Sequence, residues 1–210
     1  MAGDNSKPID TMQWEVFKNP AVWVLALSSA CFYLTRYAIN SWGVFFLEAE
    51  KGYTAVEAGS IISVNSIVGI AGTFFSGILS DKLFKGNRNP PALIFGILYA
   101  ASIALFVLGP ADAILDTISM VLFGLSLGVL MAVDICPKEV SGTALGIVGI
   151  ASYLGAGIQD ALSGFLIGDN HTILNGVHTY DFSTIKLFWL GAAVLSVICT
   201  LFVWNANSKE

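Results

Sequence analysis

The chain has 210 residues, of which 55% are hydrophobic and only 12% are charged, and its mean hydropathy is +0.74. A soluble domain carries about twice that share of charged residues, so the composition excludes an ordinary soluble domain and indicates an integral membrane protein. The net charge is −5 and the basic residues are dispersed rather than gathered in a patch, so we expect no nucleic-acid partner.

Six apolar segments follow a polar lead, and they approach or exceed the roughly 20 residues that a helix needs to cross a bilayer. The lead covers residues 1–19 and has room for a short surface helix around residues 12–17. Pro20 begins the first segment, at a position that suits the start of a helix. The sequence therefore predicts an all-α membrane protein with a short tail at 205–210. The predicted spans are residues 20–47, 55–79, 92–108, 113–133, 142–167 and 184–204.

Basic residues are distributed unequally between the two sets of predicted loops. Six spans place both termini on one side of the membrane, and that side holds seven Lys and Arg residues, including the basic loop at 80–89. The opposite side holds only Lys51 and Lys186, and it includes the longest connector, residues 168–183, which we expect to be irregular. Positively charged loops favour the cytoplasm, so both termini are predicted to be cytoplasmic.

Arg36 lies in the middle of the first predicted span, far from any other Lys or Arg. An arginine at that depth costs on the order of 3 kcal/mol and usually faces a bundle interior or a water-filled cavity. Tyr33, Arg36, Tyr37 and Asn40 follow i, i+3, i+4, i+7 spacing, so they form one polar stripe on a helix. The stripe indicates a cationic site for an anion; the alternative is an arginine paired with a carboxylate for packing.

Other polar residues lie inside the second and fifth spans. Asn65 and Ser66 are in the middle of the second, and Tyr153, Gln159 and Asp160 are in the fifth. Tyr153 and Asp160 are seven residues apart and share a helix face. Three roles are open for Asp160: pairing with Arg36, binding a coupling cation, or lying near the outer interface in water. Two roles are open for Tyr153: donating a hydrogen bond to an anion, or ordinary packing.

The fifth span is rich in glycine. Small residues four apart let helix backbones approach closely in lipid, so we interpret the Gly142/Gly146 and Gly164/Gly168 pairs as helix-packing positions. The glycines of this region are Gly142, Gly146, Gly149, Gly155, Gly157, Gly164 and Gly168.

The sequence contains no pattern typical of an enzyme, a metal site or a cofactor site. Cys31, Cys136 and Cys199 have no metal-ligand spacing and are interpreted as small buried apolar residues. His171 and His178 lie together in the long connector, without a nucleophile that could be paired with them. No glycine-rich phosphate loop follows a strand.

Four stretches resemble the organophosphate:phosphate antiporters of the major facilitator superfamily. Residues 36–43 (RYAINSWG) are similar to the seventh helix of that family, and residues 77–88 (GILSDKLFKGNR) to its loop between helices eight and nine. Residues 137–144 (PKEVSGTA) and 152–156 (SYLGA) resemble helix eleven. The resemblance runs from about Trp14 to Trp204.

This resemblance implies the C-terminal six-helix half of an exchanger of sugar phosphate or glycerol phosphate for inorganic phosphate. Such a half consists of two inverted three-helix repeats, residues 20–108 and 113–204, and works by alternating access in the bacterial inner membrane. The partners are phosphate, an organophosphate, the lipid bilayer and an N-terminal half that is absent from this chain. A short fourth span, shorter than the family's helix ten, is a departure from the pattern.

The resemblance also assigns residues to roles. Arg36 matches one of two arginines that hold phosphate, Tyr153 matches a tyrosine near the site, and Asn65 and Ser66 fall at pore-facing positions. The expected conformational loop contains Asp81, Lys82 and Arg88. Ser41 stands where glycerol-phosphate members have aspartate, which leaves the organic part of the substrate open.

Two alternatives to transport stay open. Some members of the family are receptors, so the first alternative is that the chain is part of a membrane sensor that binds sugar phosphate and signals to a kinase. The third hypothesis is an inactive, truncated fragment.

Overall fold

The computed structural model describes residues 9–83, 89–127, 140–174 and 177–203. These residues form helices joined by short turns, together with one two-stranded antiparallel sheet. The elements are α1 (Ile9–Lys18), α2 (Pro20–Lys51), α3 (Ala55–Leu83), α4 (Asn89–Leu108), α5 (Ala113–Ser126), α6 (Ser141–Asp169), β1 (His171–Leu174), β2 (Val177–Tyr180) and α7 (Ser183–Phe202).

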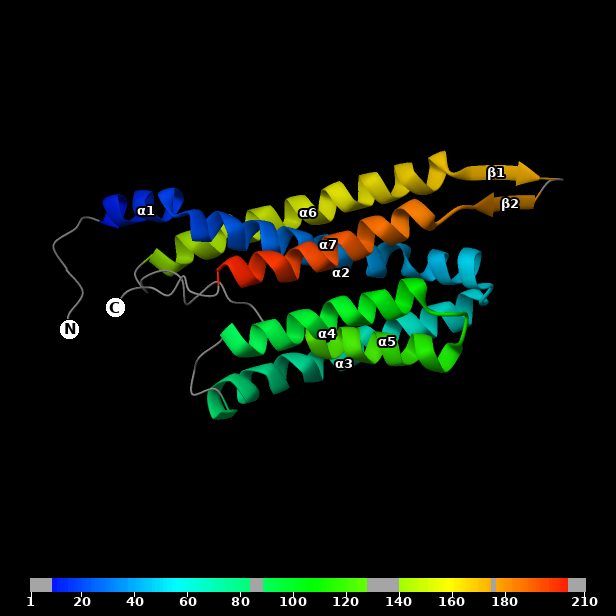
Figure 1. Cartoon of the computed structure of the whole chain (residues 1–210), viewed down its shortest axis with the longest axis horizontal. Coiled ribbons are helices and arrows are strands. Elements are labelled where there is room, and N and C mark those ends of the chain that lie inside the picture. The colour runs from blue at the N-terminus through cyan, green and yellow to red at the C-terminus, as the bar shows by residue number, and fades with distance from the viewer. Residues whose placement is uncertain (1–8, 84–88, 128–139, 175–176, 204–210) are drawn as a thin grey trace.

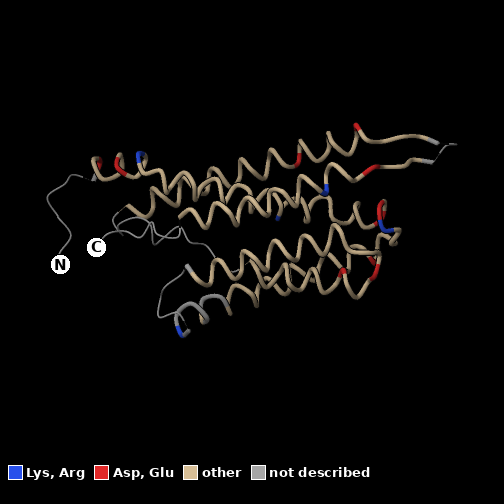
Figure 2. The backbone as a smooth tube through the Cα atoms, viewed as in Figure 1, with Lys and Arg blue, Asp and Glu red and all other residues tan. Residues whose placement is uncertain are grey.

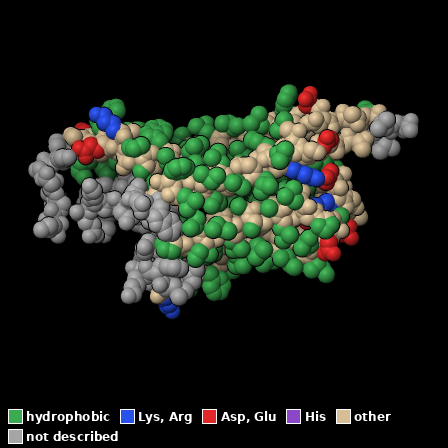
Figure 3. Space-filling model, viewed as in Figure 1, with side chains coloured by type: hydrophobic (Ala, Val, Ile, Leu, Met, Phe, Trp, Pro, Cys, Tyr) green, Lys and Arg blue, Asp and Glu red, His purple; other side chains and the backbone are tan. Residues whose placement is uncertain are grey.

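The long helices run side by side along the long axis of the molecule (Figure 1). The hairpin β1–β2 projects from one end of the bundle, which we call the hairpin end. Helix α1 and the last turn of α7 lie at the other end, which we call the α1 end. Charged residues gather toward these two ends in Figure 2, and hydrophobic side chains cover most of the middle of the visible face in Figure 3. This distribution fits a bundle whose middle lies in the hydrocarbon of a bilayer.

Local sequence signals set the ends of α2. Pro20 is its first residue, and the side-chain oxygen of Asn19 accepts a hydrogen bond of 2.9 Å from the backbone N–H of Ala21. At the other end, Gly52 has φ +74°, a left-handed conformation that favours glycine, and its N–H bonds the carbonyl of Glu48. The helix therefore carries Arg36 near its middle and Lys51 in its last turn.

Helix α2 is the centre of the bundle. It packs against α6, α7 and α3, while α3 packs against α5 and α4 packs against α5 and α7. The core between these helices is aromatic: besides Phe182, which precedes α7, it contains five large rings from the helices that are at most 1% exposed. They belong to Phe46, Tyr99, Phe106, Phe123 and Trp189.

Among the described residues, five helices are long and apolar enough to cross a membrane: α2, α3, α4, α6 and α7. Helix α5 has only 14 residues and ends at Ser126, and the rest of the fourth predicted span, from residue 128, lies outside the described residues. The count of six spans therefore stays a prediction. The short helix expected around residues 12–17 is present as α1.

One predicted connector was wrong in its structure, and the bounds of another were too wide. The segment 168–183 was expected to be irregular, but most of it forms the end of α6 and the β1–β2 hairpin, in which His171 pairs with Tyr180. The predicted loop at 80–89 is partly helical, because α3 continues to Leu83 and α4 begins at Asn89. Pro90 and Pro91 then occupy the first turn of α4, where the missing proline N–H leaves no helical hydrogen bond unmade.

The glycines of α6 were only partly interpreted correctly. A Cβ added at Gly142, Gly146 or Gly168 would meet nothing within 4 Å, so these three do not mark helix contacts among the residues that the structure describes. A Cβ at Gly164 would lie 3.3 Å from the ring of Trp42, and one at Gly155 would lie 2.5 Å from the carbonyl oxygen of Ala30. The close contact of α6 with α2 is therefore made at Gly155, outside both predicted pairs.

Candidate functional site

Arg36 lies beside three tyrosines on an open face of the bundle. Its guanidinium carbon is 5.8 Å from the centre of the Tyr33 ring, and the ring of Tyr37 stacks on Tyr33 with a centroid distance of 5.9 Å. Tyr153 of α6 presents its edge to both rings, at 5.7 Å from Tyr33 and 6.5 Å from Tyr37. Arg36 is partly exposed and Tyr153 is 65% exposed, so a ligand can reach the group.

The close crossing of α2 and α6 brings these residues together. Because Gly155 has no side chain, the backbone of α6 lies directly against that of α2 at Ala30. Tyr153 precedes this contact by two residues, and Tyr33 follows it by three on the other helix. One glycine thus sets the distance between rings from two helices that are far apart in sequence.

Arg36 has no ion-pair partner among the residues that the structure describes. Asp160, one of the partners considered from the sequence, is exposed and accepts a hydrogen bond of 2.7 Å from Gln159 Nε2. The Oε1 of Gln159 accepts from Ser163 Oγ at 2.8 Å, and Ser163 Oγ accepts from the Trp189 indole at 3.1 Å. This chain of hydrogen bonds fixes Gln159 inside the bundle and joins Asp160 to Gln159 rather than to Arg36.

Asn40, Asn65 and Ser66 lie where α3 packs against α2. Asn65 is only 2% exposed, and its Nδ2 donates to the carbonyl of Ile62 at 2.5 Å and to Asn40 Oδ1 at 3.5 Å. Asn40 and Ser66 are exposed. Of the three residues, only Asn65 is buried, and it lies against Asn40.

The residues of the expected conformational loop are not seen as a loop. Asp81 and Lys82 are in the last turn of α3, where Lys82 is exposed, and Arg88 lies outside the described residues. Asp81 and Lys82 are at the α1 end, well along α3 from the Asn65 contact.

A buried ion pair near the hairpin end was missed by the sequence reasoning. Lys51 Nζ is 2.6 Å from Asp116 Oδ1, with 4% and 0% of the two side chains exposed. Tyr53 donates a hydrogen bond of 2.9 Å to Asp116 Oδ2, and Lys51 Nζ also lies 5.4 Å from the centre of the Phe106 ring. The position of Asp116 one turn into an apolar segment was the available signal.

Two further observations describe the same region. Burial, with the hydrogen bond to Asp116 as the second cause, raises the pKa of Tyr53 to about 12. Lys186 of α7 is paired with Glu50 at the end of α2. The ends of α2, α5 and α7 are therefore joined by charged pairs at the hairpin end.

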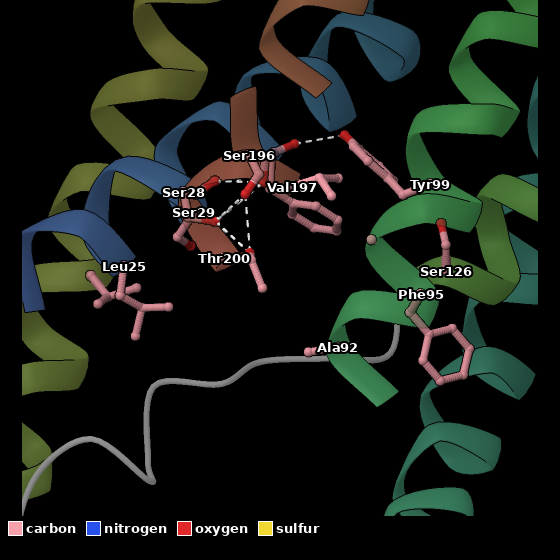
Figure 4. Close-up of a pocket in the computed structure, with 13 residues that line it drawn as sticks. Leu25, Ser28, Ser29, Ala92, Phe95, Tyr99, Ser126, Ser196, Val197 and Thr200 are labelled. Atoms are coloured by element: carbon pink, nitrogen blue, oxygen red, sulfur yellow. Dashed lines mark hydrogen bonds between the residues drawn. The ribbon is translucent and has the colours of Figure 1, made fainter. Parts of the chain in front are cut away.

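A separate pocket lies between α2, α4 and α7, toward the α1 end (Figure 4). Hydroxyl groups line it, and most of them already donate to carbonyls of the bundle. Ser28 and Ser196 donate to each other's carbonyls at 2.8 and 2.9 Å, Thr200 donates to Ser196 at 3.0 Å and Tyr99 donates to Phe32 at 2.8 Å. None of the residues that line it is charged, so this pocket offers nothing to neutralise an anion.

Comparisons with known proteins show the family of the chain. The Major Facilitator Superfamily profile matches residues 4–159. The glycerol-3-phosphate transporter of Bacillus subtilis is 24% identical over 202 residues, covering 92% of this chain and 43% of the relative. The membrane sensor protein UhpC of Salmonella typhimurium is 36% identical over 152 residues, covering 69% of this chain and 34% of the sensor.

A third relative, a probable hexose phosphate transport protein of Chlamydia pneumoniae, is 30% identical over 203 residues, covering 93% of this chain and 42% of that protein. The chain thus spans about two fifths or less of the length of these curated relatives. The resemblance to organophosphate transporters is confirmed, and the family profile covers well over half of the chain. On this evidence the chain belongs to the major facilitator superfamily.

Proposed function

We propose that the chain is one half of an organophosphate exchanger, in which Arg36 binds the phosphate group of the substrate. The observation that supports this role is an arginine without a carboxylate partner among the described residues, on an accessible face near the middle of a membrane-spanning helix. A guanidinium presents two parallel N–H donors to a phosphate, which gives both charge and geometry. The tyrosine rings beside it limit the water around the ion pair.

Alternating access would use the rest of the bundle. Helices α2–α4 and α5–α7 are the two inverted three-helix repeats of this proposal, and the open face around Arg36 is where a second six-helix half would close the site. Inorganic phosphate and the organophosphate would then compete for the same guanidinium, which makes an exchange of one for the other possible. An integral location in the bacterial inner membrane, with cytoplasmic termini, completes the proposal.

The test is phosphate binding by the purified chain in detergent. We expect Arg36→Ala to lower the affinity at least about a hundredfold, because two charged hydrogen bonds of about 1.5–3 kcal/mol each are lost. Arg36→Lys should lose part of the affinity, since lysine keeps the charge but not the fork. Lys18→Ala removes an exposed cation of α1 and is the matched control. Equal binding by all four proteins would reject Arg36 as the phosphate ligand.

A sensor is the second candidate, because the sensor of Salmonella is one of the relatives. It would use the same site without net transport. Counterflow of labelled phosphate in liposomes, with a complementary N-terminal half co-reconstituted, separates the two: exchange supports the transporter. Binding without any exchange supports the sensor, and no binding in either form supports an inactive fragment.

A further inference from the structure

The hairpin β1–β2 carries two histidines on one of its faces. In its antiparallel register His171 pairs with Tyr180 and Ile173 pairs with His178, so these four side chains share a face. His171 and His178 are therefore diagonal neighbours across the two strands. Their spacing of seven residues is not a metal-ligand pattern in the sequence. The strand register, and not the spacing, brings the two side chains together.

The two imidazole rings meet nitrogen to nitrogen. His171 Nε2 lies 2.6 Å from His178 Nδ1, and the planes of the two rings are within 12° of each other. The ring centroids are 4.8 Å apart, which is close to the nitrogen–nitrogen distance plus the two ring radii. The rings are therefore nearly coplanar, and the two nitrogens point at each other with one proton between them.

Contacts around the pair hold it in place. The ring of Tyr180 lies 4.9 Å from that of His171, and Tyr180 in turn packs edge to face with Phe45 of α2 at 5.1 Å. Next to the pair, the N–H of Asp181 donates to the carbonyl of Asn170 at 3.0 Å and continues the strand ladder toward the bundle. The backbone of the hairpin and its contact with α2 thus preorganise the two histidines.

The surroundings of the pair favour a cation. Residues 169–182 contain two carboxylates, Asp169 and Asp181, and no Lys or Arg. Both carboxylate residues are exposed, as is His178, and His171 is partly exposed. An ion can therefore reach the two imidazoles from water, in a region whose fixed charges are negative.

Imidazole nitrogens are ligands for Zn²⁺, Cu²⁺ and Ni²⁺, whereas Mg²⁺ and Ca²⁺ prefer oxygen. Two nitrogens that each lie about 2.0–2.1 Å from one tetrahedral zinc ion are about 3.3 Å apart. The two facing nitrogens would have to separate by about 0.7 Å, which small rotations of the two side chains supply. The proton between them moves to the other nitrogen of its own ring, so each ring stays neutral and presents one lone pair to the ion.

We propose that His171 and His178 form a site for one divalent transition-metal ion of the Zn²⁺ or Cu²⁺ type. The two imidazoles are its protein ligands and water completes the coordination, because the described residues contain no group of three or more His, Cys, Asp or Glu that could hold a metal. Since β1 follows α6 and β2 precedes α7, a bound ion ties the ends of these two helices together. The inference goes beyond the proposed function and does not depend on Arg36.

Calorimetric titration of the purified chain, without a polyhistidine tag, tests the proposal with Zn²⁺ and, for comparison, Mg²⁺. We expect the wild type to bind one Zn²⁺ and no Mg²⁺. His171→Ala and His178→Ala should each lower the Zn²⁺ affinity at least about tenfold, because one imidazole alone loses the advantage of two linked ligands. Thr179→Ala removes an exposed hydroxyl from β2 next to His178 and is the matched control, which should bind Zn²⁺ like the wild type.

Electron paramagnetic resonance of the chain loaded with Cu²⁺ counts the nitrogen ligands directly. We expect coupling to two imidazole nitrogens in the wild type and to one in each alanine variant. Unchanged Zn²⁺ affinity in both alanine variants, or a wild-type spectrum without two coupled imidazoles, overturns the inference. An equal loss of Zn²⁺ binding in Thr179→Ala would show that hairpin folding decides the binding, and also rejects it. Phosphate binding by the Arg36 variants tests the proposed function separately.

Discussion

Two cations of α2, Arg36 and Lys51, lie in opposite environments. Lys51 is buried against Asp116, its partner is held by Tyr53, and aromatic rings surround it. Arg36 is partly exposed, has no carboxylate partner in the described part of the chain, and has only tyrosine rings beside it. A charge within a membrane helix is costly, so a protein neutralises it or uses it. Lys51 is of the first kind, and under the proposed function Arg36 is of the second.

The largest expected effect on stability comes from the buried Lys51–Asp116 pair. Asp116→Ala leaves Lys51 buried without a partner, and we expect a loss of about 3–5 kcal/mol in the free energy of unfolding. Reversible unfolding in mixed detergent micelles measures it. Asp112→Ala, at the exposed cap of α5, serves as the comparison and should cost only the roughly 1 kcal/mol of a helix cap. Equal losses in the two variants would contradict the importance of the buried pair.

A double variant sharpens this point. Lys51→Met with Asp116→Leu removes both charges and keeps apolar volume, so most of the stability lost in Asp116→Ala should return, because buried ion pairs are often replaceable by packed apolar residues. If the double variant is as unstable as the single one, the network with Tyr53 stabilises the end of the bundle through its hydrogen bonds rather than through charge balance.

The geometry around Arg36 depends on Gly155. Gly155→Ala places a methyl group against the Ala30 carbonyl, and we expect a loss of about 1–3 kcal/mol in the free energy of unfolding from overpacking. The tyrosines of the two helices should separate, which weakens phosphate binding as well. Gly146→Ala is the matched control on the same helix, because a Cβ there meets nothing within 4 Å. Similar behaviour of the two alanine variants would refute the close crossing.

Part of the site and of the helix boundaries could be predicted from the sequence. The stripe Tyr33, Arg36 and Tyr37 follows from helical periodicity alone, and the structure has it on one helix beside Tyr153. Helix boundaries near Pro20 and Gly52 follow from local signals that act within one turn.

Contacts between helices could not be predicted in the same way. Glycine spacing indicates that a close contact is possible. Which glycine contacts a neighbouring helix depends on how the two helices cross, so the predicted pairs included Gly142 and Gly146 but not Gly155. The Lys51–Asp116 pair joins residues of different helices whose distance is set by the whole bundle. The family resemblance placed Asn65 at a pore-facing position, and only the packing of α3 on α2 shows it buried against Asn40.

Arg36 itself should contribute little to stability. Arg36→Met removes a charge without leaving a buried partner, so the free energy of unfolding should stay within about 0.5 kcal/mol of the wild type or rise, although phosphate binding is lost. The same unfolding assay in phosphate-free buffer provides the measurement. A loss as large as that of Asp116→Ala would mean that Arg36 is a structural cation like Lys51, and the contrast between the two would disappear.

The last expected effect is a pH dependence at the hairpin end, where Tyr53 contacts the buried Asp116. Tyr53 has a pKa of about 12 in the folded protein, because burial and the bond to Asp116 favour its protonated form, while an unfolded tyrosine titrates near 10. The raised value means that its contribution to stability is complete below pH about 10 and disappears as the pH rises through about 12, because the unfolded chain releases the proton first. Unfolding of the wild type and Tyr53→Phe across this interval isolates the contribution, since other groups titrate in both proteins. The stability difference between the two should shrink with rising pH; a constant difference would show that the Tyr53 hydroxyl does not hold Asp116.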